Sequence, residues 1–222
     1  MRDAVNKGNG NSFLYIETRC CTQLHPRLCT KYYSLIIFCV SDLCFSFSDC
    51  GVVSKKDWGG LNPVHVEYLA RPVDLVIIQH TVTQVCSTDA QCVDIVRSIQ
   101  DAHMDKLNFW DIGPSFLVGN NGKVYEGSGW LHVGAHTYGY NRKSIGIAFI
   151  GNYNEDNPEL QSIDAVKSLL KCGVDQGHLS KDYHLVAHRQ LSSTESPGRK
   201  LYSEIRKWPH FMDDVSSIKN KT

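Results

Sequence analysis

The stretch Leu75-Val76-Ile77-Ile78-Gln79-His80-Thr81 decides the fold, because four consecutive apolar residues run directly into polar ones. An apolar run of this length predicts a central, buried β-strand. Further strands, a hairpin and amphipathic helices are indicated around it, at residues 89–107, 116–126, 144–150, 163–174, 184–188 and 201–208. Strands and helices in mixed order predict a single α/β domain with a central mixed β-sheet flanked by helices.

Length and charge narrow the possible classes of protein. A chain of 222 residues is long enough for one well-cored domain with an extension. Its 23 basic and 23 acidic residues give a formal net charge of zero. A nucleic-acid surface usually shows as a basic excess or stripe, so we expect no nucleic-acid partner.

Residues 1–48 have the composition of a leader. A basic flank, an apolar region at about 32–47 and a small-residue exit are typical of a secretory signal peptide. The apolar region is interrupted by Asp42 and is shorter than the roughly 20 residues of a membrane span. The sequence therefore predicts a secreted, extracellular protein without stable membrane insertion, with a domain over 50–213 and a tail over 214–222. A membrane-anchored form is the alternative.

Four cysteines remain after the predicted leader, at positions 50, 86, 92 and 172. An even number in a secreted chain indicates two disulfides. A small loop closed by Cys86 and Cys92 is one hypothesis, and Cys50 would then bond to Cys172. The spacing alone leaves three connectivities open.

Two of the predicted strands end in histidine, at His80 and His188, while His103 and His136 lie between them along the chain. A catalytic zinc ion needs three protein ligands and a fourth position open to water. Each histidine taken singly is more often structural or on the surface than a ligand. The pattern alone leaves a metal site undecided.

Six segments, in this order, together resemble the peptidoglycan recognition proteins. They are "VVSKKDWGG" from residue 52, "RPVDLVIIQHT" from 71, "FWDIGPSFLVGNNGKVYEGSGW" from 109, "VGAHTYGYNRKSIGIAFIGNYNED" from 133, "LKCGVDQGHL" from 170 and "LVAHRQLSSTESPGRKLYSEIRKWPHF" from 185. That family is secreted, acts in innate immunity and shares its fold with bacteriophage-type N-acetylmuramoyl-L-alanine amidases. The resemblance implies this fold, with disulfides Cys50–Cys172 and Cys86–Cys92.

The resemblance also implies that the catalytic positions are altered. Enzymatic members have a zinc-binding His at the position of Gln79, a Cys ligand at Ser196 and a catalytic Tyr at Pro114, whereas the ligand at His188 is kept. A glutamine amide is a poor zinc ligand, and a serine hydroxyl does not ionise as readily as a thiol. Loss of a hydroxyl that stabilises an oxyanion typically costs about 10²–10³ in rate. We therefore expect that the protein is not an enzyme, that it has no catalytic residue, and that it binds no metal or cofactor.

The alternative is a zinc-dependent amidase that degrades peptidoglycan with other ligands, which His103 or His136 would have to supply. Catalysis would then need a rebuilt site geometry.

The cleft of this family holds the peptide stem of peptidoglycan and part of the sugar. Carried over position by position, the resemblance gives the peptidoglycan-binding residues His80, Thr81, His103, Asn108, Phe109, His136 and Asn141. Leu107 departs from the pattern, because some binders have an Arg there. Trp130 lies beside the cleft loop, although an aromatic residue is more often part of the core, and His132 and His184 are interpreted as structural or surface residues.

The third residue of the stem distinguishes two peptidoglycan types, since meso-diaminopimelic acid carries a carboxylate that Lys lacks. Members preferring the diaminopimelic form tend to have Gly-Trp in place of Asn108-Phe109, and an Arg in place of Ser128. An Arg could pair bidentately with the extra carboxylate, which is costly to bury unpaired. The resemblance therefore predicts a receptor for Lys-type peptidoglycan. It also implies an innate immune cascade, Toll or prophenoloxidase, with other recognition proteins and serine proteases as partners.

Overall fold

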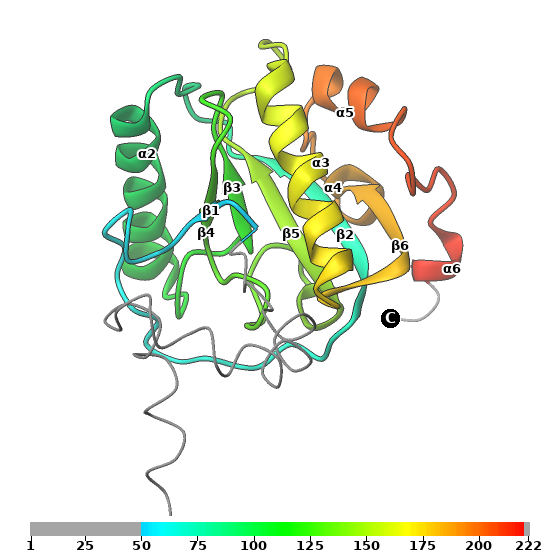
Figure 1. The fold of residues 1–222 in the computed structure, drawn as a ribbon, viewed down its shortest axis with the longest axis horizontal. Coiled ribbons are helices and arrows are strands. Elements are labelled where there is room, and N and C mark those ends of the chain that lie inside the picture. The colour runs from blue at the N-terminus through cyan, green and yellow to red at the C-terminus, as the bar shows by residue number, and fades with distance from the viewer. Residues whose placement is uncertain (1–49, 220–222) are drawn as a thin grey trace, which may run out of the picture. The chain divides into compact units, whose positions relative to one another are not determined.

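A six-stranded mixed sheet forms the centre of the computed structural model, which describes residues 50–219; the predicted leader lies outside the described residues. Figure 1 shows the strands in the spatial order β1-β4-β3-β5-β2-β6. Their bounds are Val52–Val53 for β1, Val73–His80 for β2, Phe116–Val118 for β3, Val124–Glu126 for β4, Ser144–Phe149 for β5 and Leu179–Ala187 for β6. Strands β3 and β4 form an antiparallel hairpin, and all other neighbours are parallel. The predicted mixed sheet is confirmed.

Strand β2 is central and buried, as its apolar run predicts. Every residue of β2 except Asp74 is buried between β5 and β6. Since side chains alternate along a strand, Ile77 packs with Val186 on one face, whereas Ile78 packs with Leu169 on the other. The sheet therefore needs cover on both faces.

Helices provide this cover. Their bounds are Asp89–Asp101 for α2, Leu160–Asp175 for α3, His188–Leu191 for α4, Arg199–Ile205 for α5 and Ser216–Lys219 for α6. Figure 1 shows α3 lying across β5 and β2, where its buried Val166 and Leu169 join Ile78 in the main core. On the other face, Val96 of α2 packs with Leu117 and Ala148. None of the helices within residues 50–219 is long and apolar enough to cross a membrane.

The helix expected over 89–107 changes character near its end. After Asp101 the chain forms a π-helical segment, η3, at Ala102–Lys106. The wider turn carries His103, whose Nδ1 accepts a hydrogen bond of 2.9 Å from the backbone N–H of Gly113. Such π-helical turns are often found at functional sites, and hydrophobic periodicity cannot reveal them.

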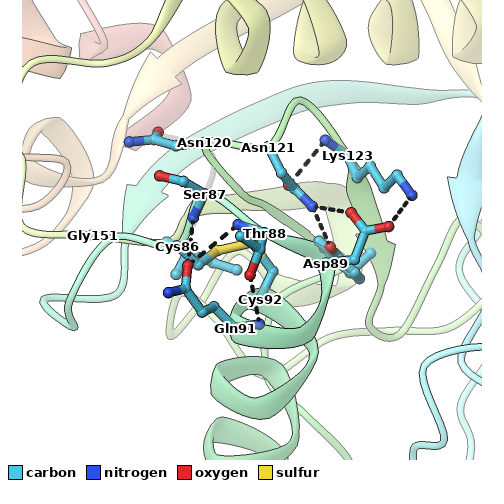
Figure 2. Close-up of a disulfide and its surroundings, with 12 residues drawn as sticks. Cys86, Ser87, Thr88, Asp89, Gln91, Cys92, Asn120, Asn121, Lys123 and Gly151 are labelled. Carbon is cyan, nitrogen blue, oxygen red and sulfur yellow. Dashed lines mark hydrogen bonds and ion pairs between the residues drawn. A yellow bond between two sulfur atoms is a disulfide. The ribbon is translucent and has the colours of Figure 1, made fainter.

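Both implied disulfides are present, Cys50–Cys172 and Cys86–Cys92. Figure 2 shows Cys86–Cys92 beside the start of α2, where Thr88 and Gln91 form a capping box. The carboxylate of Asp89 accepts a hydrogen bond of 2.9 Å from the Asn121 amide. It also forms an ion pair with Lys123, at 2.6 Å. The first turn of α2 is thereby attached to the turn of the β3–β4 hairpin.

Part of the predicted tail packs on the domain. Val215 is buried in a cluster with Leu75 and Ile77 of β2 and Tyr140, and Ile218 of α6 packs against the same cluster. The boundary at residue 213 stays a prediction.

Candidate functional site

A cleft of about 670 Å³ is the candidate ligand site. Its walls come from the segments 63–67, 108–112, 132–135 and 138–142, together with the buried Ser128. Three of the seven predicted binding residues line it: Asn108, Phe109 and Asn141. The contacts described below place His103 and His136 against the walls of this cleft, and His80 further along the end of the sheet.

His103 lies directly behind the wall formed by Phe109. The two ring centroids are 5.4 Å apart. Because Nδ1 of His103 accepts the N–H of Gly113, the proton of the neutral ring is on Nε2. Burial lowers the pKa of His103, so the ring is neutral at physiological pH. His103 therefore offers a fixed Nε2–H donor.

His80 is held in the same tautomer. Its Nδ1 accepts a hydrogen bond of 3.2 Å from the backbone N–H of Tyr153, which leaves the proton on Nε2. Burial, and secondarily the nearby His188, lower the pKa of His80 to about 4. Two of the predicted binding histidines are thus neutral Nε2–H donors.

His136 lies over Gly146 of β5. A Cβ at residue 146 would come within 2.4 Å of the His136 ring, so only glycine allows the ring to lie on the sheet. Gly146 pairs with Ile77 in the sheet register, which places His136 on the face that α2 covers. Burial, and then His188, lower the pKa of His136 to about 4. Its buried Nε2 has no hydrogen-bond partner among residues 50–219.

Asn141 shapes the loop that follows His136. Its Oδ1 accepts the backbone N–H groups of His136 at 2.9 Å and of Thr137 at 2.7 Å. The carboxamide oxygen is therefore used within the loop, and the amide NH₂ remains for a ligand in the cleft.

Gln79 and Ser196, at which the sequence resemblance predicts replaced zinc ligands, are engaged in hydrogen bonds of the protein itself. Nε2 of Gln79 donates to the carbonyl oxygen of His136 at 2.8 Å and to Oγ1 of Thr137 at 3.1 Å. Oγ of Ser196 accepts the backbone N–H of His80 at 3.1 Å. Over residues 50–219, no three His, Cys, Asp or Glu side chains gather where they could hold a metal ion. The residues present do not fit a catalytic zinc ion.

Two further residues considered in the sequence analysis, Thr81 and Trp130, make their contacts away from the cleft. Oγ1 of Thr81 accepts the N–H of Gly151 at 3.1 Å and lies 2.7 Å from the hydroxyl of Thr83, so this hydroxyl is used in its own loop. Trp130 packs with the main core and stacks on His178 with the rings 5.0 Å apart, as expected for a core residue.

His132, which we interpreted from the sequence as a structural or surface residue, lines the cleft and touches Tyr68 edge-on, with ring centroids 5.4 Å apart. No local pattern distinguishes His132 from a surface histidine. Leu107 is exposed beside the cleft segment.

The low pKa values of His80 and His136 predict a pH-dependent stability. The unfolded chain takes up protons as the pH falls below about 6.5, whereas the folded chain does so only near pH 4. Stability is therefore fully present above pH 6.5 and is lost as the pH falls. Between pH 7 and pH 5, the free energy of unfolding should decrease by about 2 kcal/mol for each of the two groups.

Denaturant unfolding at the two pH values measures this loss. His80→Asn retains an acceptor for the Tyr153 N–H but does not titrate, so we expect its decrease between pH 7 and pH 5 to be about 2 kcal/mol smaller than that of the unaltered protein. Equal pH dependence in the variant and the unaltered protein would contradict the assignment.

Comparisons with known proteins agree with this fold. The family model described as N-acetylmuramoyl-L-alanine amidase matches residues 69–199, so the chain has the amidase class of domain. A peptidoglycan recognition protein of Trichoplusia ni is 72% identical over 75% of this chain and 91% of that relative. The solved structure of Manduca sexta Peptidoglycan Recognition Protein-1 is 63% identical, with a TM-score of 0.75, and the match covers 78% of this chain and 98% of that one.

A third match is peptidoglycan recognition protein LE, solved in complex with tracheal cytotoxin, a monomeric diaminopimelic acid-type peptidoglycan. It is 43% identical, with a TM-score of 0.72, over 73% of this chain and 96% of that one. This chain belongs to the peptidoglycan recognition proteins.

Proposed function

We propose that this protein is a secreted, non-catalytic receptor that binds bacterial peptidoglycan in the cleft. The observation that carries the proposal is that the side chains of Gln79 and Ser196 form hydrogen bonds within the protein. Both side chains stand at zinc positions of the enzymatic relatives, and both are engaged in hydrogen bonds of the protein. The cleft beside them keeps the donors that a peptide ligand needs.

Those donors suit the peptide stem of peptidoglycan, which presents several carbonyl groups and a carboxylate. The Nε2–H groups of His80 and His103 and the amide NH₂ of Asn141 would donate to such acceptors, and of these three residues Asn141 lines the cleft itself. Phe109 adds an apolar wall. A few fixed polar groups in a largely apolar cleft are typical of a small-ligand site.

The absence of catalysis in the proposal is supported by the side chains present at the positions of the zinc ligands. Only His188 remains of the three ligands that a zinc-activated water would need. Pro114 supplies no hydroxyl, and its carbonyl oxygen accepts the backbone N–H of Ser128 at 3.1 Å. Binding without cleavage is the role left to the cleft.

The preference for Lys-type peptidoglycan rests on the charges around Ser128. Ser128 lines the cleft, and its buried Oγ has no hydrogen-bond partner in the described part of the chain. Among the described lining residues, the one Arg or Lys is Arg142, whose guanidinium already makes two hydrogen bonds with Glu67. A carboxylate entering beside Ser128 would lack a free cation, and burying it is costly.

Calorimetric titration of the purified protein with Lys-type and diaminopimelic-type muramyl tripeptides tests this function. We expect the Lys-type peptide to bind at least about tenfold more tightly, equivalent to 1.4 kcal/mol for one poorly paired carboxylate. A chelator should leave both affinities unchanged. Tighter binding of the diaminopimelic peptide would overturn the preference, and stoichiometric zinc with release of stem peptide would favour the amidase.

Activation of the Toll or prophenoloxidase cascade, through other recognition proteins and serine proteases, is the downstream part of the proposal. Protease activation in hemolymph, with Lys-type peptidoglycan added in the presence and absence of the protein, tests it separately.

A further inference from the structure

A second groove, separate from the cleft, lies between helix α3, strand β6 and the loop at residues 208–210. Its volume is about 370 Å³, and ligand sites usually have volumes of about 300–1,000 Å³. Figure 1 shows α3 and β6, the two elements that pack against each other here. This α3–β6 groove shares no lining residue with the cleft. A molecule bound in the groove therefore leaves the cleft free.

The floor of the α3–β6 groove is apolar and recessed. Leu170 of α3, Tyr183 of β6 and Trp208 line it, and they are only 3%, 7% and 6% exposed. The ring of His210 stacks on Tyr183, with centroids 4.2 Å apart. His210 has a left-handed φ of 66°, a conformation that is uncommon outside glycine and is enriched at ligand sites. The floor therefore offers a place for an apolar side chain.

Lysines form the rim around this floor. The ammonium group of Lys167 lies 5.3 Å from the centroid of the Trp208 ring, and Lys171 pairs with Asp175 one helical turn further on. Lys181 of β6 is exposed and forms no ion pair within residues 50–219. Because three lysines and one aspartate line the groove, it is net positive in a chain whose formal net charge is zero.

Nearby acidic groups do not remove this positive charge. The carboxylate of Glu204 on α5 already accepts a hydrogen bond of 2.9 Å from Nζ of Lys207. Asp182 follows Lys181 on β6 but does not line the groove. In the described part of the chain, Lys167 and Lys181 thus have no hydrogen-bonded carboxylate, and both are available to an acidic partner.

Shape and charge together select the chemistry of the occupant. Binding to a membrane surface needs apolar side chains that project outward, but none of the large apolar residues exposed on the described chain lines this groove. A phosphate polymer would pair with the lysines and leave the apolar floor uncovered. An acidic protein segment with an apolar side chain matches both features, because its carboxylates reach the lysines while that side chain covers the floor.

We propose that the α3–β6 groove is a docking site for an acidic segment of a partner protein. One apolar side chain of the segment packs on Leu170, Tyr183 and Trp208, and its carboxylates pair with Lys167 and Lys181. The inference goes beyond the proposed function and does not depend on it, since the groove and the cleft are separate. The protein would therefore hold a partner and a cleft ligand at the same time.

Fluorescence anisotropy tests the proposal with a labelled synthetic peptide that has glutamates on both sides of one leucine. We expect it to bind the purified protein, and a peptide with serine in place of the leucine to bind at least about fivefold more weakly. Lys181→Glu should weaken binding about fivefold, and Lys167→Glu combined with Lys181→Glu at least about tenfold. Lys56→Glu changes an exposed lysine outside the groove and the cleft, and should stay within about twofold. A Lys-type muramyl tripeptide should bind all variants equally.

Several outcomes would overturn the docking site: no binding of the acidic peptide, equal binding of the leucine and serine peptides, or full binding to the double lysine variant. Displacement of a bound muramyl tripeptide by the acidic peptide would place the peptide in the cleft and also overturn it. Phosphatidylglycerol vesicles and a glycerol phosphate oligomer test the other anionic ligands. If either binds in a way that Lys181→Glu abolishes while the acidic peptide does not bind, the groove belongs to that ligand. Failure of the muramyl tripeptide alone to bind would count against the proposed function and not against the groove.

Discussion

The double variant Gln79→His, Ser196→Cys is expected to bind one zinc ion per chain, with His188 as the third ligand. The two substitutions add an imidazole and a thiol where an amide and a hydroxyl now stand. Burial lowers the pKa of His188, so its ring is neutral and able to coordinate at pH 7. Two His and one Cys leave the fourth position of a tetrahedral site open to water.

The substitutions have identifiable local costs. Gln79→His removes the hydrogen bonds to the His136 carbonyl oxygen and Thr137 Oγ1, and Ser196→Cys replaces the acceptor of the His80 N–H with a weaker one. These losses should lower the stability of the metal-free variant, and zinc should restore it because the metal binds the folded state. Metal analysis after dialysis, with thermal unfolding with and without zinc, measures both effects.

A matched control places the thiol elsewhere. Gln79→His with Ser193→Cys has the same composition, but Ser193 is exposed in the loop before Ser196, so we expect no stoichiometric zinc. Adding Pro114→Tyr to the zinc-binding variant should raise any amidase rate by about 10²–10³-fold, by supplying the missing hydroxyl. Stoichiometric zinc in the unaltered protein would contradict the whole account of the cleft.

The fold was predictable where short-range pattern dominates. The apolar run ending at Ile78 predicted a buried strand, and β2 is indeed covered on both faces. The hairpin predicted over 116–126 turns at Gly122, which has a left-handed φ of 74°. The π-helical turn that carries His103 could not be predicted in this way. Its hydrogen bond to Gly113 comes from tertiary structure.

The candidate site was predictable only through resemblance. Resemblance supplied the residue positions, but it did not supply their hydrogen bonds, such as Asn141 folding its own loop or Thr81 bonding to Gly151. The ion pair between Glu67 and Arg142 joins segments that no sequence period relates. Long-range contacts of this kind are fixed by the packed fold and not by local propensity.

Loss of the Cys50–Cys172 disulfide is expected to be the most destabilising small change to the covalent structure. This bond joins residues separated by 122 positions, whereas Cys86–Cys92 spans 6. In the chain-entropy model, the long loop contributes about 5 kcal/mol to the free energy of unfolding and the short one about 2 kcal/mol. Double alanine variants of each pair, compared by denaturant unfolding, measure the difference.

The start of α2 explains why the short disulfide should matter less. With Cys86 and Cys92 replaced by alanine, the capping box of Thr88 and the links from Asp89 to the hairpin remain (Figure 2). Cys50 precedes the two-residue strand β1, whose pairing with β4 is short. The long disulfide therefore attaches the beginning of the domain to α3, and fraying of β1 should accompany its loss. A larger decrease for the Cys86–Cys92 pair would show that packing around its buried sulfurs, and not loop entropy, dominates.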